Sequence, residues 1–389
     1  MMHLAFPKFD HRERELVDEC LSSGWVTQGP LTERFEAQLA SRHQVSQAMA
    51  TTSCTAALHL AILALGLRPG DEVIVPAFTW ITSASCAEYV GAKPVFVDCD
   101  PNTYNIDPNK IKAAITPNTR AIVAVHLFGL AADIDAIKAV VGDQKIAIIE
   151  DAACAIGTLY KGVPVGGLGD LGCFSFHPRK VITTGEGGLV TTSNEILAER
   201  VKIFRNHGSM HKPELRDGEK PGPWTMAEFG EAGFNLRLSD IQSAVGLAQL
   251  EKLDGLLSDR RRRARDYDEK LAELVGIALP FQDAGHSYQS YVIRLTDRGR
   301  KYRNVVMQAL SKANIATRPG THSVPNTAFY KSKYDLKPTD FPIATSLENE
   351  TITLPLFPGM TSNHVDQVVA ALRSALSYTP MTRLTCSIT

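Results

Sequence analysis

The sequence predicts an α/β protein with a mainly parallel sheet, followed by a smaller α+β C-terminal domain. Short, almost wholly apolar and β-branched runs recur through the first half, as expected for strands buried on both faces of a parallel sheet. The intervals between these runs are long enough for crossover helices. After about residue 250 the pattern changes to long amphipathic helices with a single strand-like run between them. These observations divide the chain into predicted domains at 1–250 and 251–389.

The strands and helices of the first domain follow in order along the chain. The predicted buried strands are Glu72–Val75, Pro94–Asp98, Ala121–Val125 and Ile146–Ile149, with helices at Asp107–Ala114 and Asp133–Val141. Two later runs, Cys173–Phe176 and Gly188–Thr192, are joined by a Gly-rich link that is too short for a crossover helix. We therefore expect this last pair to be antiparallel.

The C-terminal domain is predicted from three segments. Leu250–Leu274 has the pattern of one long amphipathic helix, Tyr291–Leu295 that of a strand, and Arg300–Ala313 that of a second helix. The first helix contains four consecutive arginines, Arg260–Arg263. A run of like charges on a helix usually forms a solvated face, so we favour that interpretation over a nucleic-acid patch.

Composition excludes several classes of protein. The 389 residues include 41 Lys and Arg against 42 Asp and Glu, a balance that argues against a general nucleic-acid binder. The N-terminal residues lack an apolar signal core, and the longest apolar stretch is too short to span a membrane. The seven cysteines never form a Cys-x-x-Cys pair, which is typical of reduced cysteines in the cytoplasm. We expect a cytoplasmic enzyme.

Two motifs are weak candidates for function. Gly167–Gly172 matches the Gly-x-Gly-x-x-Gly fingerprint of dinucleotide sites, but a strand-like run follows it where that fingerprint requires a helix. His207 and His211 have a spacing used by metal ligands, but Gly208 interrupts the helix that would align them. We predict neither a nicotinamide site nor a metal site.

A stronger signal comes from three separate segments. Thr51–Ala57 opens an apolar helix with small hydroxyl residues, which suits a phosphate or serves only as a helix cap. Asp151 follows a buried strand at the sheet edge where ligands bind. Lys180 lies in a turn after another strand, followed by glycines that permit close approach, and is a candidate Schiff-base former. An acid, a lysine and a phosphate-suited helix start together predict a pyridoxal phosphate site.

These residues carry a resemblance to a known family. The segment from Glu150 through Lys180 to Gly188 resembles the DegT/StrS family of pyridoxal-phosphate sugar aminotransferases, of the fold type I shared with aspartate aminotransferase. Four further segments resemble the same family: Gly24–Pro30, Gly70–Trp80, Phe234–Gln242 and Leu354–Thr361. The likeness covers nearly the whole chain.

The resemblance implies roles for individual residues. Lys180 would form the Schiff base with pyridoxal 5'-phosphate and then carry the proton during transfer. Asp151 would keep the pyridine nitrogen protonated through a charge-assisted hydrogen bond, and Trp80 would stack on the ring. Asn235 would reach the cofactor phosphate of a neighbouring subunit, which implies a homodimer with shared sites.

The remaining implied contacts concern the phosphate and the cofactor's phenolic oxygen. Thr55, Ser175 and the backbone amides of Cys54 and Ala56 would hold the phosphate. The family commonly has Gln three residues after the acid, beside the phenolic oxygen, whereas this chain has Cys154, a weak hydrogen-bond partner. His177 is either a site residue or a structural one.

The resemblance implies transfer of an amino group from an amino acid, expected to be glutamate, to a keto sugar carried on a nucleotide. A 4-keto-6-deoxyhexose is the expected acceptor, with a keto-cyclitol or a 3-keto sugar as the alternative. Sugar dehydratases of the same fold replace the lysine with His, so Lys180 favours transfer. A non-enzymatic regulator would not need the lysine, the acid and the phosphate donors together.

Overall fold

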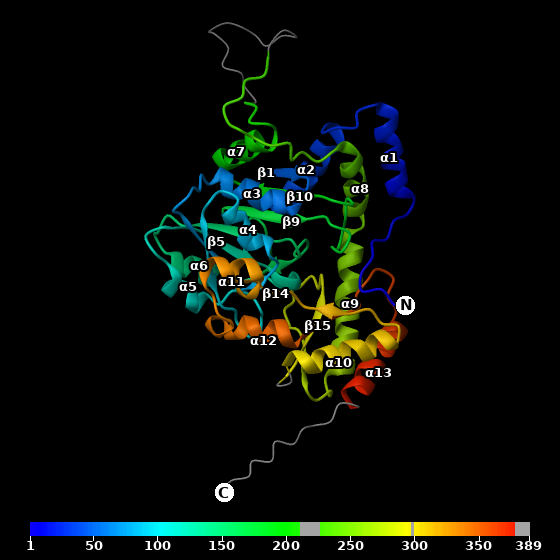
Figure 1. Cartoon of the computed structure of the whole chain (residues 1–389). Coiled ribbons are helices and arrows are strands. Elements are labelled where there is room, and N and C mark those ends of the chain that lie inside the picture. Colours follow the sequence, from blue (N-terminus) through cyan, green and yellow to red (C-terminus); the bar gives the residue numbers. More distant parts are fainter. Residues whose placement is uncertain (211–225, 297–298, 378–389) are drawn as a thin grey trace.

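The computed structural model describes residues 1–210, 226–296 and 299–377, which form a large α/β unit and a smaller α+β unit below it in Figure 1. A seven-stranded sheet lies at the centre of the large unit. Its strand order is β1 (Gln47–Thr51), β10 (Gly188–Thr192), β9 (Leu171–Ser175), β6 (Ala147–Asp151), β5 (Thr119–Val125), β2 (Glu72–Pro76) and β4 (Lys93–Val97).

The direction of the strands agrees with the sequence analysis. β10 is antiparallel to both of its neighbours, β1 and β9, and the four pairs from β9 to β4 are parallel. The predictions of a mainly parallel sheet and of an antiparallel β9–β10 pair are therefore confirmed. β1 was not predicted, and its last residue, Thr51, was expected at the start of a helix.

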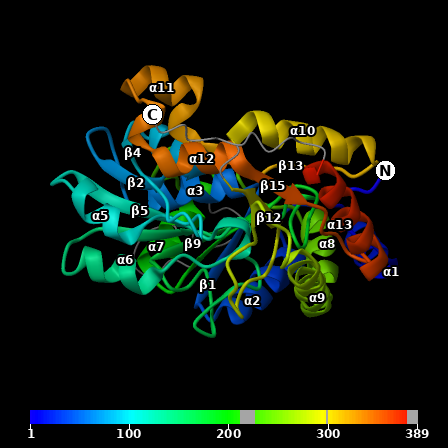
Figure 2. The ribbon, with the colours of Figure 1, turned by 90° about the horizontal axis from the view of Figure 1, so that it is seen from below.

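Helices cover both faces of the sheet (Figures 1 and 2). They are α1 (His11–Ser23), α2 (Pro30–His43), α3 (Cys54–Ala64), α4 (Thr82–Glu88), α5 (Pro108–Ala114), α6 (Ile134–Val141), α7 (Glu195–Arg205) and α8 (Asp240–Glu251). Alternate side chains of each strand pack on opposite faces. Val73 and Val75 belong to the core beneath α3, α4 and α7, whereas Ile74 faces α5 and α6. α1, α2 and α8 cover the β1 end of this second face.

The smaller unit contains a four-stranded antiparallel sheet with helices against it. Its strands are β11 (Ile277–Ala278), β12 (Tyr291–Leu295), β15 (Thr351–Leu354) and β13 (Arg318–Pro319), and its helices are α9 (Leu253–Leu271), α10 (Gly299–Lys312) and α13 (Ser362–Ser377). A separate hydrophobic core joins these elements. α9 is shorter than the predicted helix, because α8 ends at Glu251 and Lys252 separates the two.

The large and small units also contact each other at places other than the α8–α9 connection. β14 (His322–Ser323) pairs with β3 (Phe78–Thr79) of the large unit. α11 (Ala328–Tyr334) and α12 (Pro342–Glu350) contribute Tyr330, Ala344 and Leu347 to the core beneath α3. Residues on both sides of position 250 thus share one core, and the predicted domain boundary stays a prediction. The remaining short elements are β7 (Leu159–Tyr160), β8 (Val163–Pro164), η1 (Leu127–Gly129), η2 (Val324–Asn326) and η3 (Pro338–Asp340).

The arginine run on α9 differs from the prediction. The guanidinium of Arg260 is buried and donates to the carbonyl oxygens of Tyr288, Gln289 and Leu356 at 3.2–3.3 Å. Burial lowers the pKa of Arg260 to about 10. Arg261 donates to the carbonyl oxygens of His286 and Gly157. The solvated-face interpretation is therefore wrong for these two, because a guanidinium has enough donors to bind several loop carbonyls at once. It is also wrong for Arg263, which is buried and forms an ion pair with Asp266.

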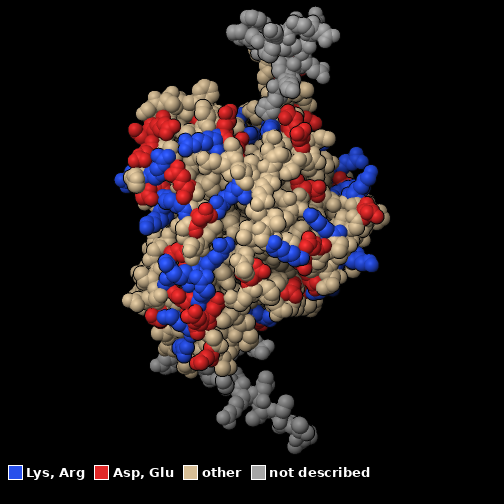
Figure 3. Space-filling model, turned by 180° about the vertical axis from the view of Figure 1, so that it is seen from behind, with Lys and Arg blue, Asp and Glu red and all other residues tan. Residues whose placement is uncertain are grey.

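The surface agrees with the balanced composition. Lys and Arg are interspersed with Asp and Glu on the face seen in Figure 3. No helix within the described residues is both long and apolar enough to cross a membrane.

A buried carboxylate joins three segments at one edge of the central sheet. Glu150 on β6 is fully buried and accepts hydrogen bonds from the amides of Gly166, Leu168 and Gly169, each at 2.7 Å. The fourth donor is Nε2 of His126, at 2.9 Å. Nδ1 of His126 accepts from the amide of Ala132, which assigns the ring proton to Nε2. The Gly-rich segment therefore binds a carboxylate of its own chain, and it leads into strand β9.

We expect Glu150→Gln to destabilise the fold. Burial alone would raise the pKa of Glu150, but the His126 and backbone hydrogen bonds hold it below its ordinary value. A Gln amide group would present N–H groups to N–H donors, so the free energy of unfolding should fall by about 3 kcal/mol. Thermal and urea unfolding of the variant measure this loss. Glu199→Gln, on an exposed position of α7, is the matched control and should change stability by no more than about 0.5 kcal/mol. Equal unfolding midpoints for the two variants would contradict the prediction.

Candidate active site

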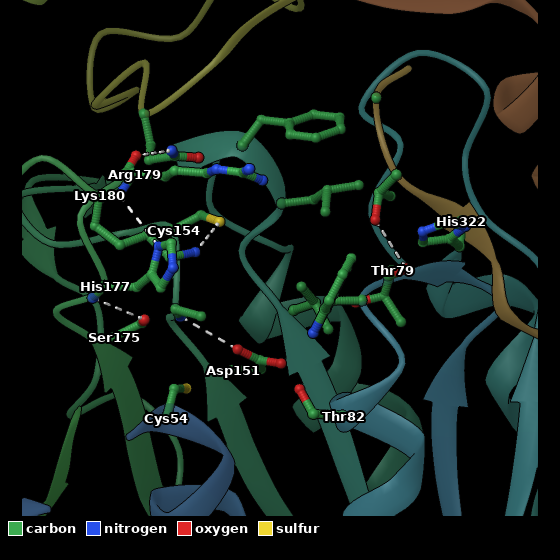
Figure 4. A pocket seen from close by; sticks show the side chains of 18 of the residues that line it. Cys54, Thr79, Thr82, Asp151, Cys154, Ser175, His177, Arg179, Lys180 and His322 are labelled. Atoms are coloured by element: carbon green, nitrogen blue, oxygen red, sulfur yellow. Dashed lines mark hydrogen bonds between the residues drawn. The ribbon is translucent and has the colours of Figure 1, made fainter. Parts of the chain in front are cut away.

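A cavity of about 590 Å³ lies at the carboxyl edge of the central sheet, between the large and small units. The strands β1, β5, β6 and β9 end at this edge, which is where open α/β sheets bind their ligands. Residues named from the sequence that line the cavity are Cys54, Thr55, Trp80, Asp151, Cys154, Ser175 and Lys180. Figure 4 shows Asp151 and Lys180 directed into this space from different segments.

Asp151 lies on the floor of the cavity and is held from two sides. It is the last residue of β6 and is almost fully buried. Its Oδ2 accepts a hydrogen bond from the hydroxyl of Ser83 at 2.7 Å, and its Oδ1 accepts from the amide of Ala153 at 3.2 Å. Ser83 in turn lies 3.0 Å from the hydroxyl of Thr79. The carboxylate is therefore positioned before any ligand arrives.

Lys180 follows β9 in a tight turn. Its backbone amide donates to the carbonyl oxygen of His177 at 2.8 Å, and its Nζ donates to Sγ of Cys154 at 3.1 Å (Figure 4). Cys154 is partly exposed, whereas the other five described cysteines are buried. The residue that departs from the family pattern thus contacts the lysine amine directly.

His177 supports the turn that presents Lys180. Nδ1 of His177 accepts from the amide of Arg179 at 3.2 Å, and partial burial lowers its pKa. This contact favours a structural role, although His177 also lines the cavity.

The N-terminus of α3 forms another wall of the cavity. The side chain of Ser53 caps this helix by accepting from the amide of Ala56 at 3.1 Å. The amides of Cys54 and Thr55 are in the first turn, where a helix offers no internal acceptor. A Cβ on Gly188 would lie 2.4–2.6 Å from the backbone of Ser53 and Cys54, so only glycine allows β10 to start this close to the helix.

Two residues predicted to contact the cofactor phosphate, Ala56 and Asn235, do not line the cavity of their own chain. The amide of Ala56 is already bonded to Ser53, and Ala56 does not line the cavity, so its predicted phosphate contact is not supported. Asn235 also does not line the cavity of its own chain; it is exposed. Trp80 lines the cavity, is 58% exposed, and its ring lies 5.6 Å from that of His322.

The small unit supplies a cationic wall that the sequence analysis missed. Arg318 on β13 and Arg303 on α10 line the cavity, together with Gln289, His322 and Glu348. Arg303 donates to the carbonyl oxygen of Glu348 and to Oδ1 of Asn304. Nothing in the sequence links these separated residues, since only the pairing of β13 with β15 and of β14 with β3 brings them to the site.

This donor set fits pyridoxal phosphate. The cavity contains one primary amine beside a buried carboxylate, and hydroxyls next to open helix amides. No group of three or more His, Cys, Asp and Glu side chains suited to a metal ion occurs among the described residues, and His211 lies outside them. The fold and the site together define a pyridoxal-phosphate enzyme of fold type I.

Comparisons with known proteins identify the family. A model of the DegT/DnrJ/EryC1/StrS aminotransferase family matches residues 7–373, and the chain belongs to this family. The spore coat polysaccharide biosynthesis protein SpsC of Bacillus subtilis is 37% identical over 375 residues, covering 95% of each chain. The GDP-perosamine synthase of Caulobacter vibrioides is 39% identical over 380 residues, covering 96% of this chain and 98% of its own.

A solved structure agrees with these relatives. The PMP-form of Spr1654 from Streptococcus pneumoniae, named a putative sugar aminotransferase, superposes with a TM-score of 0.90 at 30% identity, covering 97% of this chain and 98% of its own. The protein is thus a pyridoxal-phosphate-dependent sugar aminotransferase, as the resemblance implied.

We expect Asp151→Asn to bind the cofactor yet react slowly. Asn keeps the shape and a hydrogen bond to Ser83 but removes the charge, and losing one preorganised electrostatic partner costs about 10²–10³ in rate. Absorbance reports cofactor binding and a coupled assay reports turnover. Asp335→Asn, an exposed left-handed position at the end of α11, is the matched control and should leave both unchanged. A rate within a few-fold of wild type would remove Asp151 from the mechanism.

Proposed function

We propose that the enzyme transfers the amino group of glutamate to a nucleotide-linked 4-keto-6-deoxyhexose. The observation that carries the proposal is the presence of Lys180 and Asp151 in one cavity of a sugar aminotransferase fold. A relative named a GDP-perosamine synthase supports a nucleotide-linked sugar as the acceptor. A keto-cyclitol or a 3-keto sugar is the alternative acceptor within the same chemistry.

The residues of the cavity have distinct parts in the proposed reaction. Pyridoxal phosphate, when bound, would supply an electron sink for the reaction. Lys180 would hold the cofactor through its Nζ atom, and the same amine, once free, would accept and return the proton that is moved. Asp151 keeps a proton on the pyridine nitrogen. Thr55, Ser175 and the amides of Cys54 and Thr55 hold the phosphate, and Trp80 covers one face of the ring.

Cys154 has a separate part in this proposal. Its thiol contacts the lysine amine where the family commonly places Gln beside the phenolic oxygen. A thiol donates only weakly, so we propose that it leaves the lysine free to move rather than anchoring the ring.

We propose that the active sites are shared in a homodimer. The segment 24–32 lies against Asp240, which accepts hydrogen bonds from the amides of Gly29, Leu31 and Thr32. Several large apolar side chains in this segment and in residues 229–241 are exposed: Trp25 54%, Val26 42%, Phe229 62%, Phe234 40% and Ile241 36%. Large apolar side chains left exposed favour coverage by a partner. Asn235 follows Phe234 in the chain, is exposed and does not line the cavity of its own chain, which supports its contact with the partner's phosphate.

A substrate panel tests the acceptor and the donor. The enzyme, incubated with ¹⁵N-glutamate and nucleotide-linked 4-keto-6-deoxyhexoses, 3-keto sugars and a keto-cyclitol, should place the label at C4 of a 6-deoxyhexose. Mass spectrometry of the sugar product identifies the labelled carbon. Lys180→Ala should produce no labelled sugar, because it removes the covalent attachment. If only the cyclitol carried the label, a keto-cyclitol would replace the 4-keto-6-deoxyhexose as the proposed acceptor.

Subunit mixing tests the shared site. Asn235→Asp should inactivate every site of its homodimer by placing a carboxylate against the phosphate, and Lys180→Ala should inactivate every site of its own. In a mixed dimer one site carries both defects and the other neither. Random re-association should therefore restore roughly a quarter of wild-type activity in an isologous dimer. Each variant re-associated alone is the control. Proven mixed dimers without activity would place Asn235 in its own subunit's site.

A further inference from the structure

A chain of buried hydroxyl groups ends on the carboxylate of Asp151. The hydroxyl of Ser83, on α4, lies 2.7 Å from Oδ2 of Asp151, and the hydroxyl of Thr79, on β3, lies 3.0 Å from that of Ser83. Both Ser83 and Thr79 are buried. Their hydroxyl groups therefore find hydrogen-bond partners within the protein rather than in water.

The number of protons determines the direction of this chain. An ionised carboxylate can only accept hydrogen bonds, so the single hydroxyl proton of Ser83 points to Asp151. The oxygen of Ser83 is then left to accept the hydroxyl proton of Thr79. The chain runs from Thr79 through Ser83 to Asp151, and successive hydrogen bonds of this kind strengthen one another.

The backbone that carries the two hydroxyl groups is fixed from both units of the protein. Thr79 is paired with His322 of β14, and its carbonyl oxygen accepts from the hydroxyl of Thr321 at 2.9 Å. Ser83 lies in the first turns of α4, and its amide donates to the carbonyl oxygen of Trp80 at 3.2 Å. These contacts lie within the chain itself, so they do not depend on a ligand in the cavity.

In the proposed function, Asp151 keeps a proton on the pyridine nitrogen of the cofactor. When a buried carboxylate and a pyridine nitrogen share a proton, the ion pair competes with a neutral pair in which the carboxylate holds that proton. Donors aimed at the carboxylate favour its charged form and thus the ion pair. The donors to Asp151 are the hydroxyl of Ser83 at 2.7 Å and the amide of Ala153 at 3.2 Å, so Ser83 forms the shorter bond.

We propose that Ser83, supported by Thr79, is a positioning residue that keeps the shared proton on the pyridine nitrogen rather than on Asp151. Ser83 does not line the cavity, so it acts only through the carboxylate. The inference rests on the proposed function, since it builds on the part given there to Asp151.

Nitrogen NMR of the enzyme loaded with pyridoxal phosphate labelled with ¹⁵N in its ring tests the inference without any substrate. The ¹⁵N chemical shift of a pyridine differs between the protonated and the neutral ring. Ser83→Ala should move the resonance from the protonated position toward the neutral one, whereas Ser83→Thr keeps the hydroxyl and should retain the wild-type resonance. Thr79→Val removes only the second donor and should give a smaller change in the same direction.

Ser85→Ala is the matched control. Ser85 lies on the same helix, and its hydroxyl donates to the carbonyl oxygen of Ile81 at 3.0 Å instead of to Asp151. This variant should retain both the wild-type resonance and the wild-type turnover. Ser83→Ala should turn over roughly 10- to 100-fold more slowly, because a hydrogen bond to a charged group contributes that much. Cofactor absorbance and circular dichroism verify that each variant folds and binds the cofactor.

Asp151→Asn separates the two ways in which the inference can fail. If the resonance of Asp151→Asn moves toward the neutral position but that of Ser83→Ala stays at the wild-type position, Ser83 has no influence on the proton and the inference is overturned. Should Ser83→Ala not fold, an unchanged resonance in Thr79→Val would overturn the supported chain in the same way. If Asp151→Asn itself leaves the resonance unchanged, the part proposed for Asp151 is wrong, and the inference falls with it.

Discussion

The burial of Glu150 is the constraint on which the site depends. A fully buried carboxylate is tolerated only when its oxygen atoms are saturated with donors, and here the donors come from the end of β5 and from the loop before β9. Satisfying one charge therefore ties together the end of β5, the end of β6 and the loop that enters β9. Asp151 is the next residue along β6, Ser175 is the last residue of β9, and Lys180 follows it. The buried carboxylate thus joins the segments that carry these cavity-lining groups.

Much of the large unit could be predicted because the sequence patterns of its strands lie within short segments. Runs such as Glu72–Val75 are apolar on both faces and flanked by turn residues, and they become β2 and its neighbours with small shifts at their ends. Lys180 and Asp151 could be found because Asp151 ends one strand and Lys180 follows another, each in a short, specific segment. β1 was missed because Gln47–Thr51 is short and leads directly into the hydroxyl-rich start of α3.

The site residues that the small unit contributes could not be predicted, because distant strand pairing places them. Arg318 reaches the cavity through a two-residue strand, β13, whose position depends on β15 far along the chain. The arginines of α9 were misjudged for a related reason. Arg260 has the same sequence surroundings as an exposed arginine, and only the carbonyls of Tyr288, Gln289 and Leu356, brought by folding, make it a buried one.

The two walls of the cavity belong to different sheets. Asp151 and Lys180 are carried by the central sheet, whereas Arg318 and Arg303 are carried by the small antiparallel sheet and α10. Mutations at sites with no shared partners have nearly additive effects on stability. Substitutions in the small unit's wall at positions that contact no residue of the central sheet can therefore accumulate without disturbing the lysine and its acid. This separation lets descendants of one ancestral chain acquire new substrates while the chemistry of nitrogen exchange is inherited unchanged.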